Sequence, residues 1–173
     1  MRFVIFVLLM ATSAMSFAKG VYLSSEAFVK EVFAGTPPAP EMLWLTGKKR
    51  EHAEQILQHR PASLRTRYWK KEQRTVWILE EVGKDKPITV GLVINRNKIE
   101  RIRVLVFRES RGDEVRHDFF TNQFNQAGLT KDHRLTKKID GITGATLSVR
   151  ALTKLAALAL YLHTEVSKEN DAQ

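Results

Sequence analysis

The chain has 173 residues, of which 43% are hydrophobic and 27% charged, a composition typical of a globular protein with one sizeable domain. It contains no cysteine, which excludes disulfides, thiolate-ligated iron–sulfur clusters and the Cys-x-x-Cys-His attachment of c-type haem. The formal net charge of +9 predicts a basic surface, suited to an acidic protein partner, anionic lipid head groups or nucleic acid.

Residues 1–18 have the features of a cleavable secretory signal. Arg2 precedes an apolar run over residues 3–11, and small residues follow at Ser16 and Ala18. The run is far shorter than the roughly 20 residues that a membrane-spanning helix needs. We therefore expect cleavage after Ala18 and export of a soluble protein to the periplasm, where nucleic acid is the least suitable of the three partners.

Residues 19–63 are predicted to form an N-terminal helical segment of unassigned role. The sequence "SSEAFVKEVF" offers Ser24 or Ser25 as an N-cap and spaces its apolar residues as in a short amphipathic helix. The proline-rich "AGTPPAPE" ends this helix, and "MLWL" is a short apolar stretch. The sequence "KKREHAEQILQHR" predicts an exposed helix that Pro61 terminates.

From residue 64 onward the apolar residues alternate with a period of two. The pair "LRTRYWKK" and "RTVWILEEV" and the pair "ITVGLVIN" and "KIERIRVLVF" each surround a short polar turn, which predicts two hairpins. The expected result is an antiparallel sheet of about four strands with one face buried.

Helices are predicted after these strands. In "HDFFTNQFNQAG" a short helix should turn Phe119, Phe120 and Phe124 toward the core and stop at Gly128, and the structure of the polar "LTKDHRLTKKI" is left open. From Ala145 to Val166 a broad apolar stripe at helical spacing predicts a buried helix. The fold class is α+β, an antiparallel sheet packed with helices, with the C-terminal helix central and the main domain spanning residues 64–173.

No catalytic residue or metal site is evident in the usual patterns. The five histidines lack metal-site spacing and are expected at the surface or as satisfied, partly buried groups. Glu80 and Glu81 occupy consecutive strand positions and should point to opposite faces at a solvated strand end. The arginines and aromatic residues around Tyr68 and Trp69 could form a nucleic-acid platform. Strand alternation places Arg65, Arg67 and Trp69 on the face opposite Tyr68 and Lys70, which is more typical of a sheet with a packed aromatic face and a basic outer face.

The stretch "DGITGATLSV", residues 140–149, allows two explanations. It can be a plain connector, in which the glycines permit tight turns and a hydroxyl caps the following helix. It can also be a site, because a helix N-terminus with free amides would stabilise a phosphate at Thr146.

The residues from Asp140 to Thr146, Asp-Gly-Ile-Thr-Gly-Ala-Thr, resemble the Asp-Gly-x-(Ser/Thr)-Gly-Ala-Thr motif of the FMN-binding domain family. That family includes the flavin-carrying subunits of the sodium-pumping NADH:quinone reductase and of the Rnf complex. The resemblance extends more loosely from about Pro87 to the end of the last helix. Where family members commonly have Glu-Thr-Pro-Gly after a strand, this chain has Glu-Ser-Arg-Gly at residues 109–112.

The resemblance implies that a flavin transferase uses FAD to attach FMN covalently to Thr146 through a phosphoester. It also implies a set of cofactor-binding residues around that threonine. They are Asp140, Gly141, Thr143, Gly144, Ala145, Glu109 and Ser110. Arg108, Arg111 or Arg116 is expected close enough to stabilise reduced flavin by its positive charge.

The function implied is electron transfer by an exported flavoprotein or redox subunit, rather than an enzyme acting alone. Its expected redox partner is a c-type cytochrome or a membrane quinone-linked reductase, with no nucleic acid and with membrane contact only through a partner. The alternative is an interaction or assembly module that binds flavin weakly or not at all and docks an acidic partner on its basic surface.

Overall fold

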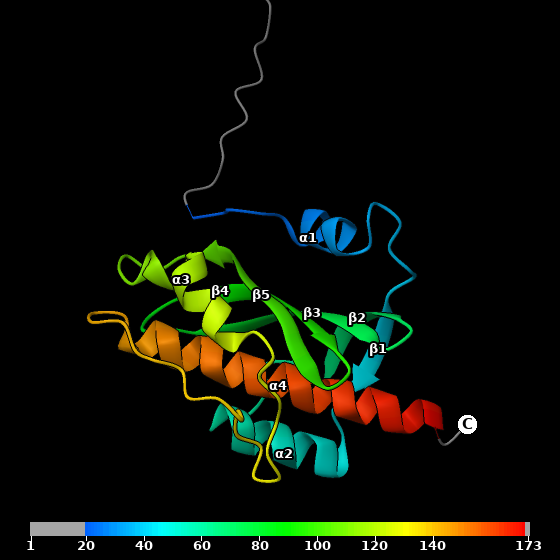
Figure 1. The fold of residues 1–173 in the computed structure, drawn as a ribbon. Helices are drawn as coiled ribbons and strands as arrows, with labels where there is room; N and C mark the ends of the chain where they lie inside the picture. The colour runs from blue at the N-terminus through cyan, green and yellow to red at the C-terminus, as the bar shows by residue number, and fades with distance from the viewer. Residues whose placement is uncertain (1–19, 172–173) are drawn as a thin grey trace, which may run out of the picture.

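The computed structural model describes residues 20–171, so the predicted signal peptide lies outside the described residues. A single antiparallel sheet has the strand order β1-β2-β3-β4-β5, so each strand pairs with its neighbour in sequence (Figure 1). The strands are β1 (Glu41–Trp44), β2 (Arg65–Lys71), β3 (Arg74–Val82), β4 (Pro87–Asn95) and β5 (Lys98–Phe107). The α+β class and both predicted hairpins are confirmed.

The sheet has one strand more than the expected four. The additional strand, β1, comes from the "MLWL" stretch and pairs with β2 at the sheet edge. Leu43 and Leu45 are buried, whereas Met42 and Trp44 between and beside them are exposed. Two buried positions are too few to establish a period of two in the sequence, so only the pairing with β2 identifies this strand.

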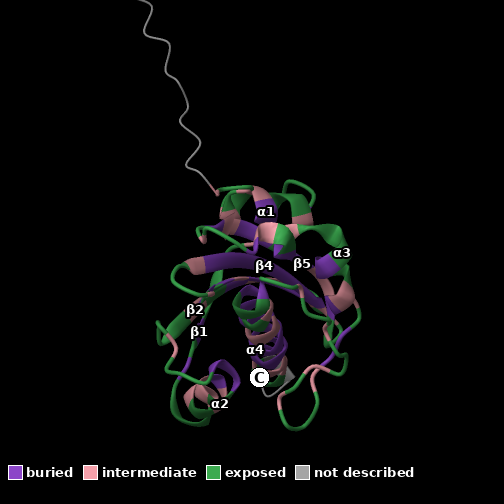
Figure 2. Ribbon diagram, turned by 90° about the vertical axis from the view of Figure 1, so that its left-hand side faces the viewer, coloured by how far each residue is buried: buried purple, intermediate pink, exposed green. Residues whose placement is uncertain are grey.

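The helices are α1 (Ser25–Val32), α2 (Gly47–Leu57), α3 (Asp118–Thr121) and α4 (Thr146–Asp171), with 3₁₀ turns η1 (Asp113–Arg116) and η2 (Asn122–Phe124). As predicted, the C-terminal helix is central. The end-on view places α4 beneath the curved sheet, with α2 on its far side (Figure 2). Leu152, Leu155 and Ala159 of α4 are fully buried. Because α2 and the sheet cover opposite sides of α4, its apolar residues extend around most of the helix.

The central strands of the sheet are buried on both faces, which corrects the prediction of one buried face. Helix α1, whose N-cap Ser24 accepts a hydrogen bond from the Ala27 amide, packs on the face opposite α4. The Phe28 ring lies so close to Gly91 of β4 that a Cβ at Gly91 would be 2.5 Å from Phe28 Cε1. The nearly continuous apolar sequence of β4 is the signature of a strand covered on both sides.

Helix α2 differs from the prediction in its exposure and its end. Ala53, Ile56 and Leu57 are buried against the core, so the helix is exposed on one side only. It ends at Leu57 because Gln58 adopts a left-handed conformation with φ 62°, before Pro61 is reached.

The phenylalanine-rich segment is also less regular than predicted. It divides into α3 and η2 rather than one helix, so Phe120 and Phe124 face the core whereas Phe119 is 64% exposed. Helical structure ends at Phe124, ahead of the predicted stop at Gly128. The following segment, which the sequence left open, is a loop closed by a bridge between Leu129 and Leu135.

Candidate functional site

The motif that resembles a flavin-attachment sequence forms the sharp turn into α4. The Ala145 amide donates to Ile142 O at 3.0 Å, and Gly144 has φ 84°, a conformation that favours glycine. Ala145 O accepts the first helical hydrogen bond, from Val149 N at 2.9 Å. Thr146 is therefore the first helical residue, and its side chain is exposed.

This geometry corrects the expected hydroxyl cap. Ala145 holds the N-cap position, and its methyl group cannot accept a hydrogen bond. Within residues 20–171, no acceptor is bonded to the amides of Thr146, Leu147 or Ser148. Three free amides at the positive end of a long helix make this turn suitable for an anionic group.

Two loops from the sheet meet the start of α4 and enclose a cleft of about 590 Å³. One is the β3–β4 turn and the other follows β5. The lining residues are Lys84, Glu109, Ser110, Arg111, Gly144, Ala145, Thr146, Leu147 and Ser148. The volume lies within the range of about 300–1,000 Å³ that is typical of cofactor and ligand sites.

Gly112 allows the loop after β5 to approach α4 closely. It has φ 84°, and a Cβ at this position would lie 3.1 Å from Ser148 Oγ and 3.2 Å from Ala145 Cβ. A side chain here would be strained in conformation and would press against the helix start. The glycine shared with the family's Glu-x-x-Gly segment thus brings Ser110 and Arg111 to the cleft.

The Glu109 carboxylate is bound to the β3–β4 turn. Its Oε1 accepts hydrogen bonds from the amides of Lys84, Asp85 and Lys86 at 2.5, 2.7 and 2.9 Å. Burial opposes ionisation, but the hydrogen bonds from these amides, together with the Lys84 charge, outweigh it and hold the pKa of Glu109 below its ordinary value. The carboxylate is therefore charged at neutral pH and joins the two loops of the cleft.

The structure brings only part of the predicted cofactor-binding set together. Gly144, Ala145, Thr146, Glu109 and Ser110 line the cleft. The remaining three, Asp140, Gly141 and Thr143, lie on the exposed loop before it and do not line the cleft. The Asp140 amide donates to Gln123 Oε1 at 2.7 Å, which fixes the start of this loop on the η2 segment.

Only one of the three expected arginines is at the site. Arg111 lines the cleft, whereas Arg108 donates to Pro87 O and Thr89 Oγ1 on the outer sheet surface. Arg116 pairs with Asp113 and lies over the Tyr22 ring. Of the three alternatives, Arg111 is therefore the one that lies at the cleft. The second cation in the cleft is Lys84, which sequence reasoning missed because only strand pairing brings this turn beside Thr146.

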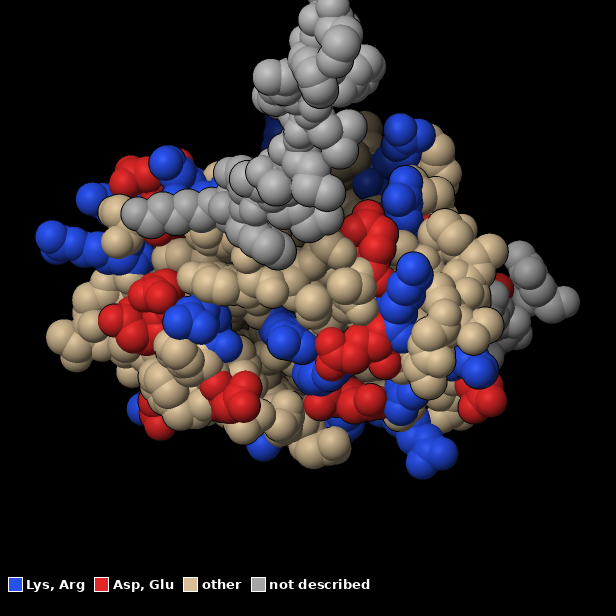
Figure 3. Space-filling model, turned by 90° about the horizontal axis from the view of Figure 1, so that it is seen from above, with Lys and Arg blue, Asp and Glu red and all other residues tan. Residues whose placement is uncertain are grey.

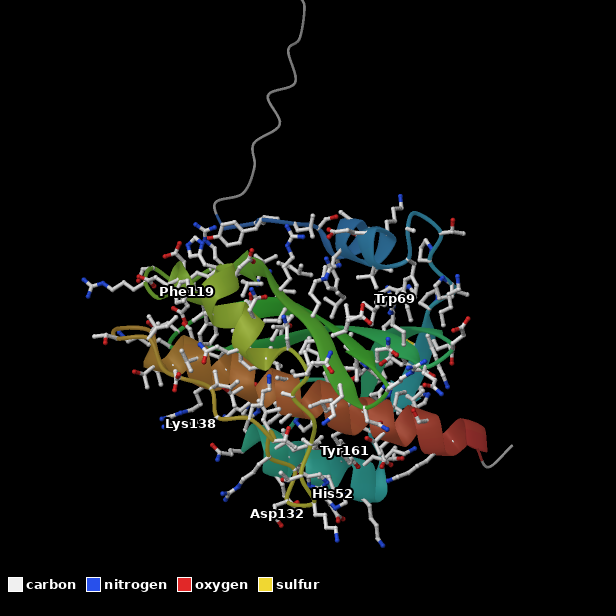
Figure 4. All side chains as sticks on the ribbon, in the orientation of Figure 1. His52, Trp69, Phe119, Asp132, Lys138 and Tyr161 are labelled. Carbon is white, nitrogen blue, oxygen red and sulfur yellow. The ribbon has the colours of Figure 1, made fainter. Side chains whose placement is uncertain are left out.

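The histidines lie at the surface or are partly buried and paired, as predicted, except that His163 is fully buried. Buried His163 is hydrogen-bonded to Thr75, and the His52 and His133 rings lie 4.7 Å apart beside Tyr161. His52 Nδ1 lies 3.2 Å from the Tyr161 hydroxyl oxygen, and both residues are labelled in Figure 4. Among residues 20–171, no group of three or more potential ligands is placed to hold a metal ion.

Glu80 and Glu81 point to opposite faces of β3, as predicted, but only one of them is solvated. Glu81 is buried on the α4 side, where it contacts His59 Nε2 at 2.9 Å and Lys154 Nζ at 3.8 Å. Glu80 is exposed and bonded to Thr89. The expected solvated strand end is therefore wrong for Glu81.

Other surface features do not converge on the predicted residues. A groove of about 610 Å³ follows the edge of β5, lined by residues such as Tyr22 and Arg103, but it contains none of the predicted cofactor-binding residues. The face seen from above carries positive and negative side chains in an interspersed pattern (Figure 3). The net positive charge is not gathered into one patch on that face.

A family model described as the FMN-binding domain matches residues 83–161. Residues 83–161 therefore form an FMN-binding domain. The matched segment begins at the β3–β4 turn, includes the Glu109 loop and Thr146, and ends within α4, so it contains every residue that lines the cleft. No curated protein and no solved structure matches the chain.

FMN is the cofactor of this domain, and the cleft fits it. The free amides of α4 with Lys84 and Arg111 suit a phosphate, and the exposed threonine stands beside them. Within the described part of the chain, none of the helices combines the length and the apolar character needed to cross a membrane.

Proposed function

We propose that this protein is an exported periplasmic flavoprotein that carries FMN on Thr146 through a phosphoester and acts in electron transfer. The observation that carries the proposal is the exposed hydroxyl of Thr146 at a helix start with free amides, inside the family-matched cleft. Covalent attachment in this position would place the phosphate where the helix dipole and two cations favour it.

The two residues before Thr146 support this assignment, because both are small. Ala145 and Gly144 present little bulk beside the hydroxyl, which leaves room for the transferase and for the incoming FMN. Apart from its two chain neighbours, no residue within 20–171 has an atom within 4 Å of the position that a Cβ at Gly144 would occupy. The transferase, acting on FAD, is accordingly the first expected partner.

Electron transfer is the function that the surroundings of the cleft favour. FMN, when bound, supplies reversible uptake of electrons. The protein would contribute attachment, orientation and the positive field of Lys84 and Arg111. No histidine lines the cleft, and its one carboxylate, Glu109, is occupied by turn amides, so proton-transfer chemistry on a substrate has little support here.

The proposed redox partner is a c-type cytochrome or a membrane quinone-linked reductase, since an acidic partner would complement the net charge of this chain. Membrane contact would then occur only through that partner. The family match disfavours the alternative of an interaction module without flavin. Its support is the exposed pair Arg65 and Arg67, which have no ion pair among residues 20–171 and lie beside exposed Trp44, where an acidic partner could dock.

Attachment is tested by expressing the full chain with an exported flavin transferase and examining the denatured protein. We expect fluorescence that persists in denaturing electrophoresis and an added mass of one FMN residue. Thr146→Val should abolish both, since valine keeps the shape of threonine but lacks the hydroxyl. Retention of denaturation-resistant flavin by this variant would refute attachment at Thr146.

Thr143→Val is the matched control. Thr143 is also exposed and lies three residues earlier, outside the cleft lining. We expect it to keep full flavin attachment. Loss of flavin in this variant but not in Thr146→Val would move the attachment site.

A further inference from the structure

We propose that Lys84 is a cofactor-facing cation of the FMN site and that Glu109 is the positioning residue that holds it there. This inference rests on the proposed function for its redox readout. Both side chains line the cleft with Thr146, yet Lys84 lies outside the attachment motif and comes from a different turn. Lys84 would thereby give the β3–β4 turn, which the motif does not include, a role in the FMN site.

Glu109 clamps the β3–β4 turn to the loop after β5 through hydrogen bonds to the turn amides. One oxygen, Glu109 Oε1, accepts all three successive amides of the turn, from Lys84 to Lys86. Gly83 makes room for it, because a Cβ at Gly83 would lie 2.9 Å from Glu109 Oε1 and 3.1 Å from Ile88 Cδ1. A turn held by three charge-assisted hydrogen bonds has a defined direction relative to β5.

The backbone of the β3–β4 turn positions the Lys84 side chain in the cleft. Among residues 20–171, the Lys84 ammonium forms one ion pair, with the adjacent Asp85 at 3.8 Å, and both side chains are largely exposed, at 74% and 68%. Such a pair is too weak to fix the position of Lys84. Its position in the cleft therefore depends on the backbone of the turn, and so on Glu109. Lys86, in the same turn, is exposed and does not line the cleft.

The charges of Lys84 and Glu109 should affect the midpoint potential of a bound flavin. Reduction adds negative charge to a bound flavin, so a nearby ammonium favours the reduced form and raises the midpoint potential. The Glu109 charge acts in the opposite direction, but it is shared with three amides. Removing the carboxylate charge alone and removing the clamp should therefore have opposite effects on the potential.

The experiment measures the midpoint potential of the flavin in the full-length holoprotein. Lys84→Gln should shift the potential to a more negative value, whereas Lys86→Gln, the same charge change in the same turn, should leave it nearly unchanged. Equal shifts in the two variants would show that Lys84 acts only as general surface charge and would overturn its assignment.

Two substitutions separate the clamp from the charge of Glu109. Glu109→Gln keeps an oxygen acceptor for the turn but removes the negative charge, so it should raise the potential. Glu109→Ala releases the turn and should give a potential below that of Glu109→Gln. In the double variant, Lys84→Gln should shift the potential less on the Glu109→Ala background than alone. Identical potentials for the alanine and glutamine variants, or fully additive shifts, would overturn the positioning role.

A measurement without flavin distinguishes this inference from the proposed function. In the apoprotein, the amide resonances of Lys84, Asp85 and Lys86 should shift together with pH, following one pKa below the ordinary value for glutamate. The shift should vanish in Glu109→Gln. Absence of a common titration would refute the clamp, whereas absence of flavin on the wild-type protein would refute the proposed attachment and leave the clamp standing.

Discussion

The polar groups at the two ends of α4 differ in burial and in hydrogen bonding. At the N-terminal end, the amides of the first turn have no acceptor among residues 20–171, and Thr146 is exposed beside Lys84 and Arg111. Toward the other end, His163 is only 3% exposed and is hydrogen-bonded to Thr75 Oγ1 at 2.8 Å, which in turn accepts from Trp77 Nε1 at 2.9 Å.

The difference separates binding from stability within one helix. Buried polar groups must be paired, because an unpaired donor or acceptor in the core costs about 1–3 kcal/mol. Groups left open at a cleft keep their bonding capacity for a ligand. The polar groups at the Thr146 end are therefore available for FMN, whereas those around His163 are committed to the fold.

The strongest test replaces one threonine beside each end of α4: Thr146 at its start, and Thr75 of β3, which is hydrogen-bonded to His163 near its other end. Thr75→Val should lower the free energy of unfolding by up to about 4 kcal/mol, since it leaves both Trp77 Nε1 and His163 Nδ1 without a partner. Thr146→Val should change it by less than about 0.5 kcal/mol, because its side chain is exposed. Urea denaturation measures both, and flavin attachment should show the reverse order of effects. A larger loss of stability in Thr146→Val would break the comparison.

The buried end should also respond to acid. Burial, together with the charge of Lys70, lowers the pKa of His163 to about 4 from its ordinary value of 6.5. The folded state therefore binds fewer protons than the unfolded state between these values, so stability is lost as pH falls from 6.5 to about 4. The loss should amount to about 3 kcal/mol and be absent in His163→Gln, as measured by denaturation at several pH values. An equally steep acid dependence in that variant would assign it to other groups.

A capping substitution should pair the free amides at the start of α4, so that the polar groups at both ends of the helix are hydrogen-bonded. Ala145→Ser offers a hydroxyl acceptor to the free amides of α4 and should stabilise the fold by about 1 kcal/mol. The same hydrogen bond would compete with a phosphate, so flavin attachment should slow. Thermal unfolding and the rate of flavin incorporation measure the two effects. Faster incorporation in the stabilised protein would argue against a role for these amides.

The smallest effect on the free energy of unfolding is expected at His59, which pairs with the Glu81 carboxylate of β3. Hydrogen bonding to Arg60 O and to the Glu81 carboxylate raises the pKa of His59 above 6.5, and these contributions outweigh burial. Its stabilisation should be present below pH 6.5 and be lost as pH rises through the folded-state pKa. Because His59 is exposed, the effect should stay below about 1 kcal/mol. Comparison of wild type and His59→Gln from pH 5 to 9 measures it, and an increase in stability with rising pH would contradict the assignment.

Much of the fold could be read from the chain because its signals are local. The alternation in β2 to β5 and the apolar stripe of α4 each arise within a single element, so the hairpins and the central helix were predictable. The strand β1 and the burial of Glu81 were not. Both depend on partners more than 20 residues away in the chain, β2 for the strand and Lys154 for the carboxylate.

The site divides in the same way. The sequence by itself determined the motif at residues 140–146, the helix that follows it and the Glu-Ser-Arg-Gly segment at residues 109–112. These features depend on the backbone conformation of consecutive residues, so a local sequence pattern identifies them. Only the tertiary structure decided which cations face Thr146. Strand pairing carries the β3–β4 turn to the cleft, and Glu109 binds that turn through its amides. Amide hydrogen bonds do not depend on side-chain identity, so no residue pattern in the turn records the contact.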